Sequence, residues 1–121
     1  KIRLLFYNGM NDLICNHVGN ELLLQKLPWK NSEQWVVAPR FAWHLQEQST
    51  TSRSIVAAYV QEYENLTFLK IPHSGHMVPM DQPEISLQMI STFLHVSSFQ
   101  TIQQQLKSDP PSRTSCEKEA E

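Results

Sequence analysis

Two apolar runs, each followed by a polar loop, alternate with helical patterns along the chain. Residues 2–9, IRLLFYNG, are apolar almost throughout and end in an Asn-Gly turn. Such a run is typical of a strand that is buried on both faces of a parallel sheet. Residues 66–72, LTFLKIP, predict a second strand that ends at its proline. The chain is therefore expected to carry at least two strands of parallel-sheet character.

Helical patterns follow each of these strands. Residues 13–27 carry apolar side chains at roughly helical spacing and predict a helix, although Gly19 weakens the pattern. Residues 84–96 follow a proline and show a clearer apolar stripe, which predicts the best-defined helix of the chain. The stripe consists of Ile85, Met89, Ile90, Phe93 and Leu94.

The middle and the end of the chain have weaker patterns. Residues 28–54 hold three tryptophans and two prolines without a sustained period, which indicates an ordered excursion or short strands with an exposed tip at 47–54. Residues 55–63 fit either a strand or a short helix. A polar helical turn is expected around 102–106, and the Pro, Ser and charge content from residue 108 onward predicts disorder.

The order of strand, loop, helix, excursion, strand, loop, helix predicts an α/β fold, in particular the last strands and helices of a mostly parallel sheet. We expect residues 1–99 to form this segment and residues 100–121 to form a polar, disordered tail. Because the chain opens directly on a strand, we also expect it to be a C-terminal fragment of a longer protein or a processed subunit.

Composition and charge exclude some classes of partner. Ten basic and twelve acidic residues give a net charge of −2, so we expect no nucleic-acid partner. The chain holds no apolar stretch that could span a membrane. Cys15 and Cys116 lie in such different surroundings that we expect no disulfide between them. Asn65 begins an Asn-Leu-Thr acceptor for N-glycosylation, which matters only in a secretory protein.

Candidate chemistry lies in the two loops that follow the predicted parallel strands. Asp12 is the only carboxylate in the first loop, and His76 holds the same position in the second. A carboxylate that accepts the Nδ1 proton of a histidine fixes its tautomer and lets it act as a general base. In α/β-hydrolases the acid and the histidine follow the nucleophilic serine in this chain order. The sequence therefore predicts the second and third members of such a triad.

The first member of the triad is absent from the chain. It contains no G-x-S-x-G elbow, and Ser74 is too close to His76 to serve as one. We therefore expect the isolated chain to be inactive. Taken singly, an aspartate after Asn-Gly is more often a turn or cap residue, and a loop histidine is more often merely solvated.

A zinc site is the other interpretation of these loops. Cys15, His17, His73 and His76 offer four ligands, but their spacing does not match the common structural zinc patterns. We expect no metal and no cofactor, and we expect Cys15 to behave as a small buried hydrophobic residue.

Several stretches of the sequence resemble a known family. FYNGMNDLICNHVGNE, LPW and SGHMVPMDQP resemble the C-terminal third of the serine carboxypeptidases, which have the α/β-hydrolase fold. ICNHVG, APRFAW and ENLTFLKI look most similar to the fungal, pheromone-processing Kex-type members. The resemblance runs from about residue 2 to residue 94.

The resemblance implies roles for individual residues. Asp12 matches the acid of the triad and His76 matches its base, whereas His73 matches a position that transfers no proton. Met77 matches a residue that lines the subsite for the departing C-terminal amino acid. Cys15 matches a free, buried cysteine beside the active site.

The implied activity is release of single C-terminal residues from peptides or proteins, through an acyl-enzyme on a serine in the N-terminal part of the same enzyme. For a Kex-type member the released residues would be Lys or Arg. The implied location is the secretory pathway, in the late Golgi, in a vacuole or lysosome, or outside the cell. The resemblance leaves membrane attachment open.

Two positions depart from the family pattern. Met10 stands where the family usually has an aspartate, and Ala58 stands where it usually has a glycine. Together with the missing elbow, these departures support an alternative hypothesis, in which the protein is an inactive homologue or fragment that acts as a binding or protective module.

Overall fold

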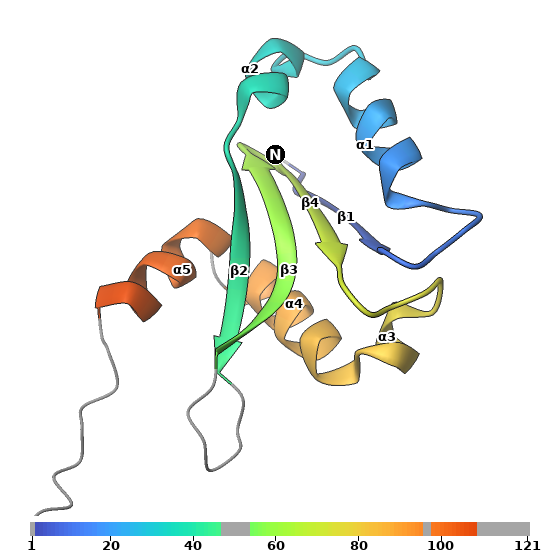
Figure 1. Cartoon of the computed structure of the whole chain (residues 1–121). Coiled ribbons are helices and arrows are strands. Elements are labelled where there is room, and N and C mark those ends of the chain that lie inside the picture. The colour runs from blue at the N-terminus through green and yellow to red at the C-terminus, as the bar shows by residue number, and fades with distance from the viewer. Residues whose placement is uncertain (1, 47–53, 96–97, 109–121) are drawn as a thin grey trace, which may run out of the picture.

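The structure is a computed structural model that describes residues 2–46, 54–95 and 98–108 (Figure 1). These residues form four strands and five helices. In chain order the elements are β1 (Leu4–Gly9), α1 (His17–Lys26), α2 (Ser32–Val37), β2 (Arg40–Gln46), β3 (Ser54–Tyr63), β4 (Leu66–Ile71), α3 (Val78–Asp81), α4 (Pro83–His95) and α5 (Phe99–Ser108).

The four strands form one sheet in the order β1-β4-β3-β2. β1 and β4 are parallel neighbours, in register from Leu4 beside Leu66 to Gly9 beside Ile71. β3 is antiparallel to both β4 and β2. The α/β class and the parallel pairing of the two predicted strands are thus confirmed, although two of the three pairings in this part of the chain are antiparallel.

Short connections explain the antiparallel pairings. Glu64 and Asn65 are the only residues between β3 and β4, and Glu64 has a φ of 52°. A link of two residues makes a tight hairpin, whereas a parallel crossover needs a dozen or more residues. The ambiguous segment 55–63 is therefore a strand, and the excursion before it contributes α2 and β2. Most of its expected tip, residues 47–53, lies outside the described residues.

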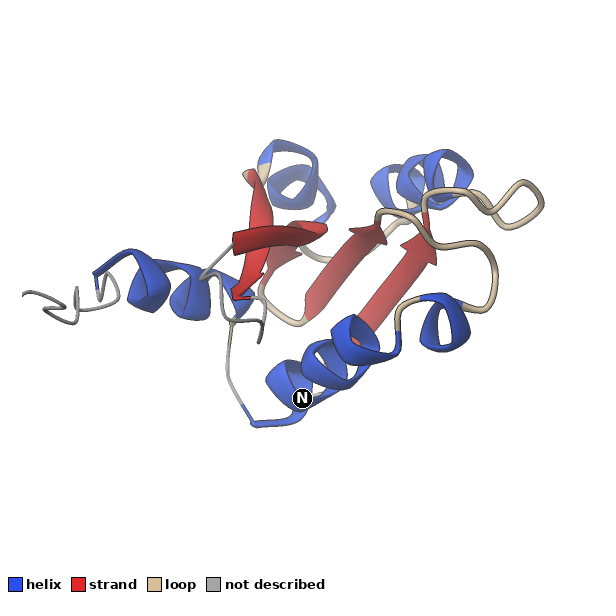
Figure 2. Cartoon of the chain, turned by 60° about the horizontal axis from the view of Figure 1, so that its bottom comes forward, coloured by secondary structure: helices blue, strands red, loops and turns tan. Residues whose placement is uncertain are grey.

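Helices cover both faces of the sheet (Figure 2). α1 and α2 pack on one face through Leu24 and Trp35, which meet Leu66 and Phe68 of β4. The side chain of Gln61 donates a hydrogen bond of 2.7 Å to the carbonyl oxygen of Trp35 and fastens α2 to β3. This packing fixes the position of α1 against the sheet, beside the loop that carries Asp12.

α3, α4 and α5 pack on the other face, around a larger core. Ile85 and Met89 of the predicted stripe are buried there, whereas Ile90 and Leu94 are 42% and 65% exposed. The core of this face consists of Trp43, Ala57, Ala58, Val60, Leu69, Ile71, Val78, Ile85, Met89 and Phe99.

α5 overlaps the predicted polar tail. Phe99 meets the ring of Trp43 edge to face, with 5.1 Å between the centroids, and the side-chain oxygen of Gln103 accepts a 2.8 Å hydrogen bond from the backbone of His44. The polar helical turn expected around 102–106 is therefore confirmed, and residues 100–108 of the expected disordered tail are helical because the helix docks on β2. The rest of the expected tail, 109–121, lies outside the described residues.

β1 is less buried than the sequence predicts. Leu4, Phe6 and Tyr7 are 50%, 38% and 40% exposed. The physical reason is that β1 pairs with β4 along one edge, while no described strand pairs with its other edge. Among the residues that the structure describes, no helix combines the length and the apolar character that crossing a membrane requires.

Candidate active site

The candidate site lies where the loops after β1 and β4 meet, at the carboxyl ends of the two parallel strands. Backbone hydrogen bonds of 2.9 Å join these loops, from Met10 to the carbonyl of Ile71 and from Asn11 to the carbonyl of Ser74. Loops at this end of an α/β sheet are where ligands and catalytic groups gather. The two loops therefore form one surface despite their distance in sequence.

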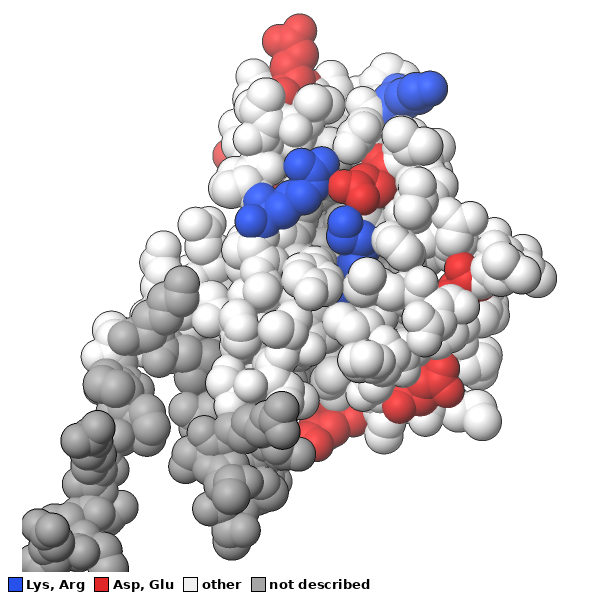
Figure 3. Space-filling model, in the orientation of Figure 1, with Lys and Arg blue, Asp and Glu red and all other residues white. Residues whose placement is uncertain are grey.

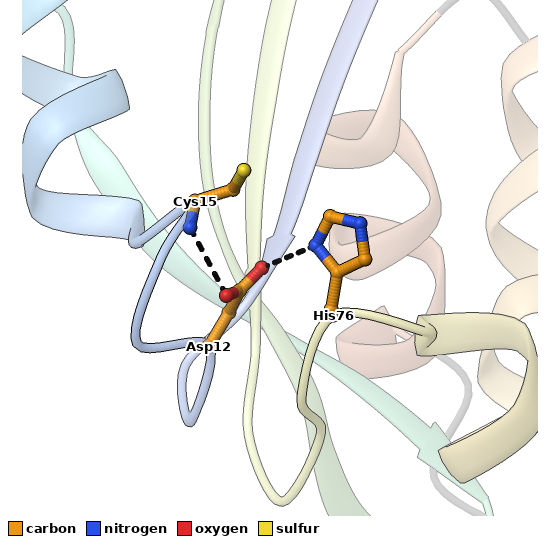
Figure 4. A group of neighbouring side chains, drawn as sticks. All are labelled: Asp12, Cys15 and His76. Carbon is orange, nitrogen blue, oxygen red and sulfur yellow. Dashed lines mark hydrogen bonds and ion pairs between the residues drawn. The ribbon is translucent and has the colours of Figure 1, made fainter.

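Asp12 and His76 face each other across these loops (Figure 4). The Nδ1 atom of His76 lies 2.8 Å from the Oδ2 atom of Asp12, although 64 positions separate the two residues. The aspartate side chain is only 6% exposed, whereas that of the histidine is 67% exposed. A buried carboxylate thus holds an imidazole whose other nitrogen is open to a partner.

The second oxygen of Asp12 is held by the backbone of its own loop. Its Oδ1 atom accepts hydrogen bonds from the amides of Ile14 at 3.0 Å and Cys15 at 3.1 Å. The hydrogen bond from His76 lowers the pKa of Asp12 below its usual value of 3.8, the two amides add to this effect, and burial opposes it. The group is therefore an ionised acceptor at neutral pH, which places the bridging proton on Nδ1.

This arrangement leaves Nε2 of His76 available for proton exchange. Figure 4 shows that this atom points away from Asp12. Ser74 does not supply the nucleophile, because it is 1% exposed and its hydroxyl donates to the neighbouring carbonyl of Gly75 at 3.2 Å. The described pair can therefore activate a hydroxyl that comes from another part of the protein.

The loop of His76 is held from behind by α3 and the residue after it. The carboxylate of Asp81 accepts a 2.7 Å hydrogen bond from the amide of Gly75, and the side chain of Gln82 donates one of 3.2 Å to the carbonyl of His73. His73 itself is exposed, with a φ of 55°. Sequence reasoning gave Asp81 no supporting role, although an acid so close behind the candidate loop was an available signal for one.

Three asparagines surround the loop of Asp12, and sequence reasoning missed all three. Asn16 accepts a 2.8 Å hydrogen bond from the amide of Gly19 and caps α1. Asn8 donates from its side chain to the carbonyl of Cys15 at 2.9 Å and accepts from the side chain of Asn20 at 2.9 Å. A polar residue at the end of an otherwise apolar strand was the available signal for Asn8.

Cys15 and Met77 both lie next to the pair, and both are exposed. The expected burial of Cys15 is wrong for the described residues, because its loop projects beyond the sheet and Leu13 and Ile14 within it are 89% exposed. Met77 follows His76 directly and is 60% exposed. Cys116 lies outside the described residues, so its pairing stays a prediction.

Asp12, Cys15 and His76 also form a group of possible metal ligands. Their donor atoms lie within 4.8 Å of one another, and no other group of this kind occurs among residues 2–46, 54–95 and 98–108. Of the four zinc ligands considered from the sequence, Cys15 and His76 belong to this group, whereas His17 and His73 do not.

Asn65 stands in the two-residue turn between β3 and β4. It is partly exposed, and its carbonyl accepts a 2.7 Å hydrogen bond from the amide of Leu4. Thr67 of the acceptor triplet is only 3% exposed in the folded chain. Glycosylation of Asn65 stays a prediction.

A charged cluster lies on the α1 side of the sheet, apart from Asp12 and His76. Glu21 of α1 binds Lys70 and Arg40, each at 3.0 Å, on the rim of a pocket of about 200 Å³. Figure 3 shows basic and acidic side chains meeting on this face. Partial burial raises the pKa of Glu21, but the hydrogen bonds and charges of Lys70 and Arg40 outweigh it and lower the pKa overall. The cluster ties α1 to β2 and β4.

Comparisons with known proteins agree on one family. A profile of the serine carboxypeptidase family matches residues 1–96. Serine carboxypeptidase S10 family member 2 of Dictyostelium discoideum is 39% identical over 92% of this chain and 19% of its own length. Pheromone-processing carboxypeptidase KEX1 of Phytophthora infestans is 37% identical over 81% of this chain and 16% of its own length.

Two further similarities broaden this result. The venom serine carboxypeptidase of Apis mellifera is 35% identical over 80% of this chain and 19% of its own length. The crystal structure of the prohormone-processing carboxypeptidase from Saccharomyces cerevisiae superposes with a TM-score of 0.65 and 28% identity, over 77% of this chain and 20% of that chain. The chain thus spans about a fifth or less of each of these proteins.

Proposed function

The chain belongs to the serine carboxypeptidase family, and from that premise we propose that Asp12 and His76 are the acid and the base of a Ser-His-Asp triad. The nucleophilic serine comes from the N-terminal part of the same enzyme, outside this chain. The complete enzyme is a serine-type carboxypeptidase that releases single C-terminal residues from peptides or proteins. The observation that carries this proposal is the 2.8 Å contact between His76 and the buried carboxylate of Asp12.

The geometry supports a definite path for the proton. Asp12 holds the proton of Nδ1, so Nε2 of His76 is free to accept the hydroxyl proton as the serine attacks the scissile carbonyl. The imidazolium then gives that proton to the departing amine, and the C-terminal amino acid leaves. Water, activated by the same Nε2, hydrolyses the acyl-serine and restores the enzyme.

Met77 and Cys15 are proposed to contact the substrate. Met77 lies next to His76 and exposes 60% of its surface, which suits a residue that lines the subsite of the released amino acid. Cys15 is exposed, its sulfur lies within 4.8 Å of donor atoms of Asp12 and His76, and it offers a small, polarizable contact. The similarity to pheromone-processing relatives favours Lys and Arg as the residues released.

The exposed apolar side chains favour a large partner surface within the same enzyme. Leu4 of β1 is 50% exposed, and Leu13 and Ile14 of the Asp12 loop are 89% exposed. Strongly exposed large apolar side chains such as these favour an interaction site. We assign it to the remainder of the enzyme, because the relatives are at least about five times as long as the part that matches.

Secretory localisation is part of the same proposal. It is supported by the Asn65 acceptor triplet and by the similarity to a carboxypeptidase that is named for its occurrence in venom. Digestion of the purified protein with a glycosidase would test the acceptor, since a mass decrease that Asn65→Gln abolishes would confirm its use.

The test of the proposed function uses the full-length protein. We expect His76→Ala to lower kcat for release of a C-terminal residue by about 10⁴–10⁶-fold while peptide binding survives. His73→Asn is the matched control, because it changes a histidine of the same loop and keeps a residue that tolerates a φ of 55°. The kcat of this control variant should lie within about twofold of the wild-type value.

Two outcomes would contradict the proposal. A near-normal rate in His76→Ala would remove the histidine from the mechanism. Failure of the wild-type protein to react with a serine-directed fluorophosphonate would remove the nucleophile and favour the alternative of a binding or protective module.

A further inference from the structure

The loop that carries Asp12 has little packing to hold it in place. Leu13 and Ile14, its apolar side chains, are both 89% exposed. Its shape therefore depends on hydrogen bonds rather than on burial, at least within the part of the chain that the structure describes. The orientation of the Asp12 carboxylate toward His76 therefore depends on the hydrogen bonds of its loop.

A continuous series of hydrogen bonds leads from α1 to the imidazole. Asn20 of α1 donates to Asn8 at 2.9 Å, and Asn8 donates to the carbonyl of Cys15 at 2.9 Å. The amide of Cys15 donates to Oδ1 of Asp12 at 3.1 Å, and Oδ2 of Asp12 meets His76 at 2.8 Å. The backbone of Cys15 is thus bound at its carbonyl by the side chain of Asn8 and at its amide by the side chain of Asp12.

We propose that Asn8 is a positioning residue for the triad, and that its side chain sets the orientation of Asp12 by holding Cys15. This rests on the proposed function, because it assigns Asn8 to the reaction of that same site. Asn8 pairs in register with Lys70 on the α1 side of the sheet, at the last position before Gly9, so the sheet itself fixes its backbone. The paired end of β1 thereby anchors a loop that has little packing within the described part of the chain.

The carboxamide is the group that this position requires. It offers a donor for the carbonyl of Cys15 and an acceptor for Asn20 at the same time. Aspartate at position 8 would keep the acceptor but lose the donor, and alanine would lose both. The carbonyl and the amide of Cys15 belong to neighbouring peptide groups that are joined at its Cα atom. Without the bond from Asn8, the backbone is free to rotate about this Cα atom, so the amide of Cys15 no longer fixes the carboxylate that orients the imidazole.

The experiment compares three variants of the full-length enzyme: Asn8→Ala, Asn8→Asp and the control Asn31→Ala. Asn31 precedes α2 and makes no side-chain capping bond, so it matches the substitution without touching the series. The first readout is kcat and KM for release of a C-terminal residue. The second is the downfield proton resonance of the His76 Nδ1–H group, which reports the bond to Asp12 and needs no catalysis.

We expect both Asn8 variants to lower kcat about tenfold or more with little change in KM, since small misplacement of a catalytic group costs up to about 10²-fold. We also expect the Nδ1–H resonance to move upfield or broaden, and Asn31→Ala to leave both readouts unchanged. Asn8→Asp keeps the size of the side chain, so it tests the proposal even where Asn8→Ala does not fold.

The proposal is overturned if the Asn8 variants only unfold more easily while kcat and the Nδ1–H resonance stay as in wild type. That result would make Asn8 a purely structural residue. Failure of the proposed function looks different, because the wild-type enzyme would then release no C-terminal residue at all. In that case the resonance alone decides whether Asn8 orients Asp12.

Discussion

The backbone of Gly75 fills the space that a side chain on Gly9 would occupy. A Cβ atom built on Gly9 would overlap the carbonyl oxygens of Gly75 and Ser74. Gly9 ends β1, and Gly75 precedes His76, so this close approach joins the two loops of the site. Absence of a side chain at Gly9 is therefore a condition for the bond between Asp12 and His76.

Gly9→Ala should consequently separate the two loops. We expect the free energy of unfolding to fall by about 1–3 kcal/mol, as for other overpacked sites, and kcat to fall with it. Urea denaturation and a peptide-release assay on the full-length protein would measure both effects.

Gly19→Ala provides the control for this prediction. A Cβ atom at Gly19 would meet the side chain of Asn16 at 3.5 Å, which is an ordinary contact, and Gly19 lies within α1. Alanine there should stabilise the helix by about 0.5–1 kcal/mol. Equal changes of unfolding free energy and kcat in the two variants would show that the site does not depend on the close approach of Gly9 to Gly75.

Asp81 should contribute to catalysis through the loop of His76. Its carboxylate accepts the amide proton of Gly75 at 2.7 Å, one residue before the histidine. We expect Asp81→Ala to lower kcat and to cost about 1 kcal/mol of unfolding free energy, because a charge-assisted hydrogen bond is lost at an exposed site. Kinetics and thermal melts would be compared with those of Glu84→Ala, which removes an exposed carboxylate from the next helix. An effect no larger than that of Glu84→Ala would contradict this role.

Two facts suffice to predict the pair of Asp12 and His76 from the sequence: each residue follows a strand, and the strands are parallel neighbours. Both facts are confirmed, with β1 and β4 in parallel register and the two side chains 2.8 Å apart. The periodicity of an apolar run is a local property, and local properties are what a single sequence displays.

The parts that the sequence did not predict depend on non-local partners. Hydrophobic periodicity does not say which strand pairs with which, so the antiparallel hairpin of β3 and β4 and the docking of α5 on β2 were not foreseen. The exposure of Cys15 and of β1 depends on which surfaces pack on them. The supporting roles of Asn8 and Asp81 depend on loop geometry, which brings a side chain to one particular backbone group.

Lys70 and Arg40 bind the same carboxylate but should differ in their contribution to stability. The side chain of Lys70 is 20% exposed and that of Arg40 is 44% exposed, so solvent screens the second ion pair with Glu21 more strongly. We expect Lys70→Met to lower the free energy of unfolding by about 1 kcal/mol and Arg40→Met by less than about 0.5 kcal/mol. Urea denaturation at low and high salt would measure the difference, and the reverse order would contradict the screening argument.

The acid dependence of stability should report the bond between His76 and Asp12. The folded state lowers the pKa of Asp12 below 3.8, chiefly through this bond. A depressed carboxyl pKa contributes stability that is fully present above the unfolded-state pKa and is lost as the pH falls through the folded-state value. We therefore expect the advantage of wild type over His76→Ala to shrink as the pH is lowered from about 5 to below the folded-state pKa.

Carboxyl-carbon NMR titration of Asp12 would measure its pKa in both proteins, beside urea unfolding at each pH. In His76→Ala the pKa should rise, while the amides of Ile14 and Cys15 still hold part of the depression. Asp12→Asn removes the titrating group. The free energy of unfolding of this variant should therefore show no acid-dependent loss from position 12. An unchanged pKa of Asp12 in His76→Ala would mean that the backbone amides, and not the imidazole, keep the carboxylate ionised.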